Sequence, residues 1–187
     1  FTPTPTTPAG GGSTFTFSPV ADASVIGNRP NNNYGTTQTL EADISPDMLS
    51  YLRFDIQGLD GSVVTATLRL YSLNTSSTGI DIVGVSDTSW GETTITYNNA
   101  PALGSTINAS GATTVDTWTE IDISSYISGE GPVSLAFTTT DPSLRLTFGS
   151  REAANSPELI VGTGGGPTPT FTPTPTATPT VPSSRNW

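Results

Sequence analysis

Apolar and polar side chains alternate with a period of two along most of the middle of this chain. In segment 50–56, for example, Leu52, Phe54 and Ile56 are separated by a tyrosine, an arginine and an aspartate. Successive side chains of a β-strand point to opposite faces, so this pattern predicts strands with one buried face. The same pattern predicts strands at 14–17, 23–26, 37–41, 64–72, 80–85, 94–97, 118–123, 133–139, 144–148 and 159–161.

Turn-forming residues separate these segments, among them Asp60-Gly61 and Asp141-Pro142. The 3.6-residue period of a helix is missing, apart from one short turn expected at 123–127. Short strands at this spacing predict an all-β fold, a jelly-roll-like antiparallel β-sandwich. We expect one such domain over residues 14–162, between an N-terminal tail (1–13) and a C-terminal tail (163–187).

Both tails are rich in threonine, with proline at nearly every second position. Proline fixes its own φ and extends the residue before it, so the tails are predicted to form polyproline II rods. Such rods keep hydroxyl groups exposed, as O-glycosylated stalks do. The candidate attachment sites are Thr2, Thr4, Thr6, Thr7, Thr168, Thr170, Thr172, Thr174, Thr176, Thr178 and Thr180.

The string FTPTPT occurs at residues 1–6 and again at 171–176, which suggests that modules and linkers repeat. We therefore expect a homopolymer in which the tail of one copy lies against the next, along a sheet edge or in a groove. Phe171, Val181 and Trp187 would be the apolar anchors of that contact. Because the chain starts within a repeat and without Met, we expect a piece of a longer exported protein.

The composition excludes several partners. The chain has no Cys, no His and no Lys, and its net charge is -10. Nucleic acid and anionic membrane surfaces would repel such a chain. No run of eighteen apolar residues is present, so we expect no membrane insertion. Low charge density with abundant Thr, Ser, Gly and Asn favours an extracellular location, at the cell surface or secreted.

Five segments in the middle of the chain resemble DNRLRE-type domains, which are relatives of the family 96 carbohydrate-binding modules. In chain order they are Asp22-Ala23-Ser24-Val25 with Asn33-Tyr34-Gly35 and Leu40; Tyr51-Leu52-Arg53-Phe54-Asp55-Ile56; Ala66-Thr67-Leu68-Arg69-Leu70-Tyr71; Trp90-Gly91-Glu92 with Ile95-Thr96-Tyr97-Asn98-Asn99-Ala100-Pro101; and Ser150-Arg151-Glu152 with Pro157-Glu158-Leu159. The resemblance covers nearly all of residues 14–161. It implies an exported jelly-roll sandwich, found on bacterial surface proteins and beside polysaccharide-degrading enzymes, without a catalytic site.

Two kinds of aromatic residue have to be distinguished. Trp90 and Tyr97 belong to the resembling segments, so packing in the core or at its rim explains them better than ligand binding. Trp118 stands between two threonines outside these segments, and sugars stack on aromatic faces, so it is a possible sugar contact. Arg151 and Glu152 are expected to make a fixed ion pair or backbone hydrogen bonds.

The residues offer little for catalysis or metal binding. Without His and Cys, neither a Ser-His-Asp or Cys-His arrangement nor a histidine-ligated zinc can form. Glu120 and Asp122 share one strand face at a separation that inverting glycosidases use. Alternation with isoleucine makes a solvated strand face the simpler interpretation. We therefore expect no enzyme and no cofactor, apart from a calcium ion that loop carboxylates could hold; the candidates are Asp22, Asp43, Asp47 and Asp87.

Asn74 and Asn108 begin N-x-[ST] patterns in segments expected to be loops, which makes them N-glycosylation candidates. Three functions remain open. The favoured one is a structural subunit or repeat of an extracellular, glycosylated bacterial surface fibre or coat. The alternative is a carbohydrate-binding module that tethers a polysaccharide-degrading enzyme to its substrate, and an enzyme is a distant third.

Overall fold

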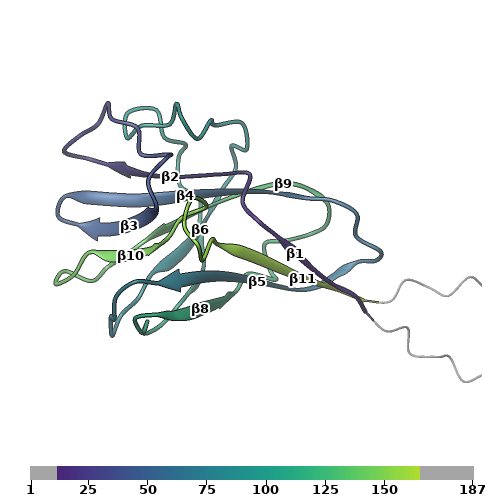
Figure 1. The fold of residues 1–187 in the computed structure, drawn as a ribbon. Coiled ribbons are helices and arrows are strands. Elements are labelled where there is room, and N and C mark those ends of the chain that lie inside the picture. Colours follow the sequence, from purple (N-terminus) through teal and green to yellow (C-terminus); the bar gives the residue numbers. More distant parts are fainter. Residues whose placement is uncertain (1–11, 165–187) are drawn as a thin grey trace, which may run out of the picture.

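The computed structural model describes residues 12–164, which form eleven strands and no helix (Figure 1). The strands are β1 (Thr14–Phe17), β2 (Ala21–Ile26), β3 (Thr39–Ile44), β4 (Asp47–Ile56), β5 (Val63–Ser72), β6 (Asp81–Val85), β7 (Thr106–Ala109), β8 (Thr117–Asp122), β9 (Gly131–Thr138), β10 (Leu146–Gly149) and β11 (Glu158–Thr163). Every pairing between these strands is antiparallel. Residues 12–164 contain no helix that is long and apolar enough to cross a membrane.

The strands form two layers that face each other (Figure 1). Sheet A contains β1, β11, β5, β8 and β10, and sheet B contains β2, β4, β9, β6 and β7. Strand β3 joins them, because its first residues pair with β10 and its last two pair with β4. The predicted antiparallel β-sandwich is therefore confirmed.

The crossing of β3 from one sheet to the other is stabilised by two buried serines. The hydroxyl groups of Ser24 and Ser50 lie 2.8 Å apart, and both accept a hydrogen bond from the backbone N–H of Glu41 at 2.9 Å. Ser50 also donates to the carbonyl of Glu41 at 2.8 Å. These side chains replace the strand partner that the backbone of β3 lacks at this point, where an unpaired polar group would be costly.

The main core lies between the two sheets and consists of the apolar side chains that the alternation predicted. Phe54, Phe137 and Phe148 are fully buried there, and the rings of Phe137 and Phe148 meet edge to face at 5.4 Å. Burial of side chains of this size supplies most of the stability of a small sandwich.

A second core covers the opposite face of sheet B. The connection between β6 and β7, residues 86–105, folds over β2 and β4 and buries Trp90 and Ile95 against Tyr51 (Figure 1). The Tyr51 hydroxyl donates to the carbonyl of Pro101 at 2.7 Å, and burial raises its pKa to about 12. Both faces of sheet B are therefore buried at β2, where every residue is buried.

Two details of the predicted strands were wrong. Segment 94–97 is not a strand: Ile95 donates its N–H to the carbonyl of Gly91, and its carbonyl accepts from the Asn33 side chain. Strand β7 was not predicted, because it is a four-residue edge strand with one partly buried apolar side chain, Ile107. One partly buried apolar side chain does not establish a period of two.

The described chain starts and ends at one place. Strands β1 and β11 pair, with Thr14 opposite Gly162. Asp60 ties this end together, because its carboxylate accepts from the hydroxyls of Ser13 and Thr163. These hydrogen bonds lower the pKa of Asp60.

Candidate functional site

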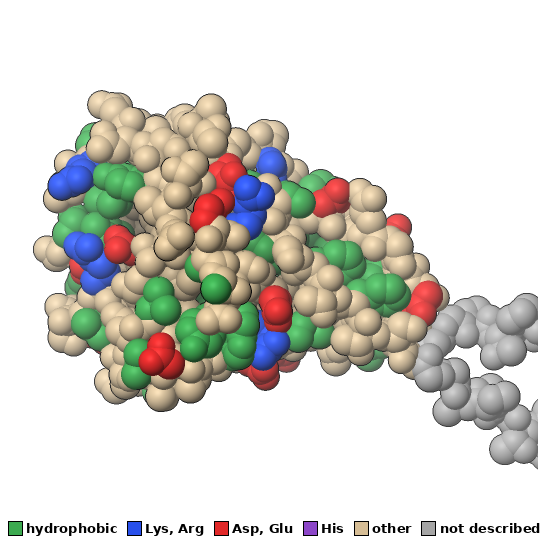
Figure 2. Space-filling model, viewed as in Figure 1, with side chains coloured by type: hydrophobic (Ala, Val, Ile, Leu, Met, Phe, Trp, Pro, Cys, Tyr) green, Lys and Arg blue, Asp and Glu red, His purple; other side chains and the backbone are tan. Residues whose placement is uncertain are grey.

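A cleft of about 380 Å³ opens at the end of the sandwich opposite to the pairing of β1 with β11. Its walls come from the loop between β2 and β3 (Asn28, Arg29 and Tyr34), from Glu41 in β3, and from Arg145 in the loop between β9 and β10. Basic side chains are visible at this end of the molecule (Figure 2). The volume falls within the range of small-ligand sites, and the lining combines one aromatic ring with donors and acceptors.

The loop that carries Tyr34 is held in place by its neighbour Asn33. The Asn33 amide donates to the carbonyls of Glu92 and Ile95, both at 2.7 Å, and its oxygen accepts from the N–H of Gly35. Gly35 lies so close to Glu92 that a Cβ would stand 2.0 Å from the Glu92 carbonyl oxygen. The Asn33-Tyr34-Gly35 segment thus fixes Tyr34 at the cleft through contacts that a larger residue at Gly35 would break.

The two guanidinium groups of the cleft differ in their partners. Arg145 lies 3.6 Å from carboxylate oxygens of both Glu41 and Asp43. Arg29 is exposed and forms no ion pair with any residue from 12 to 164. A guanidinium offers five donors in a planar fork that matches a carboxylate or a pair of oxygen acceptors. Arg29 is therefore available to a ligand, whereas Arg145 is held by the protein.

A second group of polar and aromatic side chains lies on the outer face of sheet A. Tyr71 and Trp118 are directly opposite each other on β5 and β8, and their rings meet edge to face at 5.4 Å. The Arg69 guanidinium lies over the Trp118 ring, 4.5 Å from its centroid, and pairs with Glu120 at 3.0 Å and Glu158 at 2.7 Å. We call these five residues the aromatic face. Trp118, the candidate sugar contact, is half-buried within it.

Glu120 and Asp122 both lie on this outer side, exposed, as alternation in β8 requires. Glu120 pairs with Arg69, and Asp122 accepts hydrogen bonds from the N–H and hydroxyl of Ser124 at 2.9 and 2.6 Å. These bonds lower the pKa of Asp122. Each carboxylate thus has a structural partner.

Three carboxylates meet where β2, the 86–105 connection and the β10–β11 loop come together. Oxygens of Asp22, Glu92 and Glu152 lie within 4.8 Å of one another. Arg151 stands among them: its guanidinium lies 3.0 Å from Glu92 and 3.5 Å from Glu152, and its backbone N–H donates to Asp22 at 2.7 Å. Asp22 is 1% exposed, and its burial, with the nearby acids, raises its pKa to about 7.

Comparison with known proteins decides the family. The pattern of carbohydrate-binding module family 96 matches residues 13–163, which is the whole of the folded domain. This chain belongs to carbohydrate-binding module family 96. A gellan lyase from Bacillus sp is 31% identical over 170 residues, an alignment that covers 82% of this chain and 7% of that enzyme. The chain therefore spans a small part of the curated relative that it matches.

Family membership corrects the favoured prediction of function. The expectation of a fibre or coat subunit depended on the repeated tail strings, and the tails 1–11 and 165–187 lie outside the described residues. The family and the lyase relative instead point to carbohydrate binding, which was the alternative. Nothing in the comparisons supports a homopolymer or attached glycans as partners. Modules of this kind bind carbohydrate without catalysing a reaction.

The motifs of this family 96 module are mainly structural, as predicted. Trp90 is 7% exposed and donates its indole N–H to the Ser134 hydroxyl at 2.7 Å. The Arg53 guanidinium lies 5.4 Å from the centre of the Trp90 ring and donates to the Trp90 carbonyl at 2.6 Å. Tyr97 packs against the second core and donates to Asp47.

The calcium candidates do not form one site. Asp22 lies in the carboxylate cluster with Glu92 and Glu152, neither of which was a candidate. Asp43 pairs with Arg145, Asp47 accepts from Tyr97, and Asp87 accepts from Ser89. The positive charge of Arg151 already stands within the cluster.

The modification candidates are placed as follows. Asn74 lies in the loop after β5, where its amide donates to the Arg145 carbonyl at 2.6 Å and its oxygen accepts from the Thr147 N–H. Asn108 is exposed but lies within β7, not in the expected loop, and its amide donates to the Asp122 carbonyl. The eleven tail threonines and the anchors Phe171, Val181 and Trp187 fall outside the described residues.

The cleft was not predicted from the sequence. Tyr34 belongs to one of the resembling segments, and Arg29 and Arg145 stand singly in the sequence. The one available signal was the scarcity of cations: a chain without Lys that places Arg29 in an Asn-rich loop presents a single guanidinium there.

Proposed function

We propose that this family 96 module holds a polysaccharide chain in the cleft of Arg29, Tyr34 and Arg145, and that it thereby tethers a polysaccharide-degrading enzyme to its substrate. Family membership over residues 13–163 is the observation that carries this proposal. The gellan lyase relative supports an enzyme as the neighbour, since the matching region is 7% of that protein.

The position of the cleft suits a tether. The described chain enters and leaves at the β1–β11 end, and the β2–β3 and β9–β10 loops that line the cleft lie at the other end (Figure 1). A polysaccharide in the cleft would therefore lie far from the paired strands β1 and β11. In this proposal residues 14–162 are the binding domain, residues 1–13 and 163–187 are extracellular linkers, and the whole is secreted.

The ligand class follows from Arg29. Its guanidinium lacks an ion pair in the described chain, and a carboxylate-bearing sugar unit would supply one. The face of Tyr34 would stack on the neighbouring ring. The net charge of -10 opposes the approach of anionic chains, but salt screens this repulsion beyond about 8 Å at physiological ionic strength. The local contact with Arg29 therefore determines whether an anionic chain binds.

Affinity electrophoresis tests the proposal. The wild-type module should be retarded in gels that contain gellan or alginate, and less so in xylan. Arg29→Gln and Tyr34→Ala should each weaken retardation by about tenfold in dissociation constant, as expected for central contacts. Arg185→Gln removes the same charge from the C-terminal tail and serves as the control. The proposal would be contradicted if none of the three polymers retarded the wild-type module. It would also be contradicted if both cleft variants were retarded as strongly as the wild type.

A further inference from the structure

The aromatic face has features of a ligand surface that its structural role does not require. Arg69 alone could fasten the edge strand β8 to β5 and β11, through its ion pairs with Glu120 and Glu158. Yet Tyr71 and Trp118 also place two half-buried aromatic rings on the outside of the sheet, side by side across the strand pair. Aromatic rings that remain partly in contact with water on a sheet surface are suited to stack on sugar rings.

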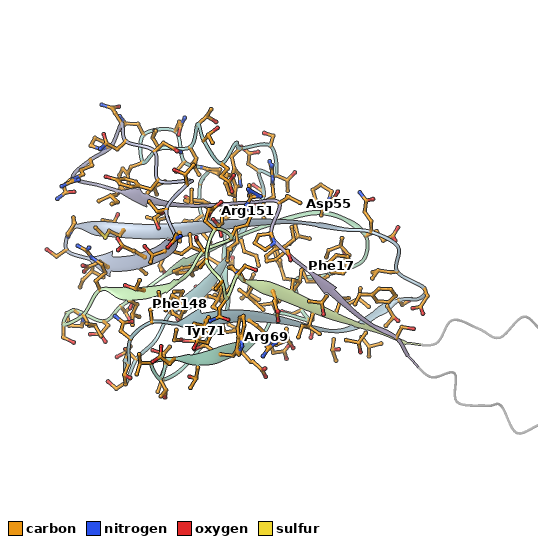
Figure 3. All side chains as sticks on the ribbon, in the orientation of Figure 1. Phe17, Asp55, Arg69, Tyr71, Phe148 and Arg151 are labelled. Atoms are coloured by element: carbon orange, nitrogen blue, oxygen red, sulfur yellow. The ribbon has the colours of Figure 1, made fainter. Side chains whose placement is uncertain are left out.

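The surroundings of these rings extend the apolar surface. Leu73, one residue beyond the end of β5, is 38% exposed, and Val115, two residues before β8, is 44% exposed. Among residues 12–164 no segment folds over this face, in contrast to sheet B, which the 86–105 connection covers (Figure 1). Tyr71 and Arg69 lie along β5 on the lower sheet (Figure 3), where a basic side chain stands between acidic ones with apolar side chains beside it (Figure 2).

The side chains of the face are held in place before any ligand arrives. The Trp118 ring is fixed by the Arg69 guanidinium on one face and by the Tyr71 ring at 5.4 Å. Arg69 is in turn fixed by two carboxylates from different strands. A rigid aromatic surface loses little conformational entropy on binding, which favours affinity.

The charges of the face select the kind of sugar. Glu120, Asp122 and Glu158 lie on this side of sheet A against one cation, Arg69, which they already neutralise. An anionic chain would meet a net negative surface, whereas the Glu120 side chain, 60% exposed, can accept hydrogen bonds from sugar hydroxyls. The face is also open along β5, over about 20 Å from Thr65 to Tyr71, which suits an extended chain more than a single sugar.

We propose that the aromatic face is a second binding surface, for an extended uncharged polysaccharide segment, separate from the cleft. It rests on the proposed function only in taking carbohydrate as the ligand. Trp118 stacks on a sugar ring through the face opposite Arg69. Tyr71, whose ring is nearly perpendicular to that of Trp118, contacts the neighbouring sugar, and Glu120 accepts from the sugar hydroxyls. With an anionic chain in the cleft and an uncharged one on sheet A, the module contacts two polymers or two regions of one polymer.

Nuclear magnetic resonance of the intact chain provides the first test, with cellohexaose, xylohexaose and mannohexaose as probes. Trp118→Phe identifies the Trp118 indole N–H signal. At least one probe should shift that signal in proportion to the fraction of the module that it occupies. The signal of Trp90, which is buried and bonded to Ser134, should stay in place. No shift with any of the three probes would overturn the proposal.

Matched variants distinguish the two surfaces. Trp118→Leu should weaken the binding of the active hexaose by about tenfold, and Arg29→Gln should leave it within about twofold. Trp118→Phe retains a ring and should retain most of the affinity, which separates stacking from a general loss of stability. If Trp118→Leu binds the hexaose as the wild type does, or if Arg29→Gln abolishes that binding, the second surface is wrong. Retardation by gellan or alginate reports the cleft independently.

Discussion

Replacement of Asp22 by asparagine should make the stability of the module less dependent on pH. Asp22 is 1% exposed, and burial raises its pKa from 3.8 to about 7; Glu152 and Glu92 add to the shift, and the N–H of Arg151 opposes it. The folded state therefore favours the protonated, neutral carboxyl. A group of this kind contributes stability that is complete below the unfolded pKa and is lost as the pH rises through the folded one.

The size of the effect follows from the shift. A pKa that is about three units higher in the folded than in the unfolded state corresponds to roughly 4 kcal/mol of stability in total. About 3 kcal/mol of this stability is lost between about pH 5 and pH 8. Asp22→Asn keeps the size of the side chain and an oxygen that can accept from the Arg151 N–H, but it cannot ionise. Between about pH 5 and pH 8 the variant should therefore lose less stability than the wild type.

Urea unfolding at the two pH values measures this difference. The free energy of unfolding of the wild type should fall by about 3 kcal/mol more than that of Asp22→Asn between about pH 5 and pH 8. Asp55→Asn, which removes an exposed carboxylate from β4, controls for the change in net charge. If the wild type and Asp22→Asn lose stability in parallel, then Asp22 is ionised throughout and the reasoning is refuted.

Other substitutions test the packing and the loop. Phe54→Ala removes a fully buried ring from the main core and should lower the free energy of unfolding by about 3–5 kcal/mol in urea titrations. Ser134→Ala leaves the Trp90 indole N–H buried without its acceptor and should cost about 1–3 kcal/mol, measured in the same way. Gly35→Ala brings a Cβ against the Glu92 carbonyl, so it should lower the melting temperature and weaken binding at the cleft together. A variant that unfolds as the wild type does would contradict the contact that its substitution removes, and unchanged affinity of Gly35→Ala would contradict the role of its loop at the cleft.

Most of the strands, and the side of each that is buried, could be predicted from the residues alone. Leu68 and Leu70 on β5 alternate with Arg69 and Tyr71, and the structure places the first pair in the core and the second on the outer face. This works because alternation is a local property: one face of a strand meets water and the other does not, and the chain records that difference every second residue. The family resemblance could be recognised from the sequence because most of the resembling segments stabilise the sandwich.

The residues at the cleft and on the far side of sheet B could be identified only from the folded chain. Arg29 and Arg145 are far apart in the chain, and they line one cleft because the β2–β3 and β9–β10 loops lie at the same end of the sandwich. Asp22, Glu92 and Glu152 meet because the 86–105 connection folds back over β2, a contact that also hides the second face of that strand. Such contacts depend on the path of the whole chain, and local spacing does not encode that path. The alternation of residues thus predicted a sandwich, and the folding of its loops decided where the cleft lies.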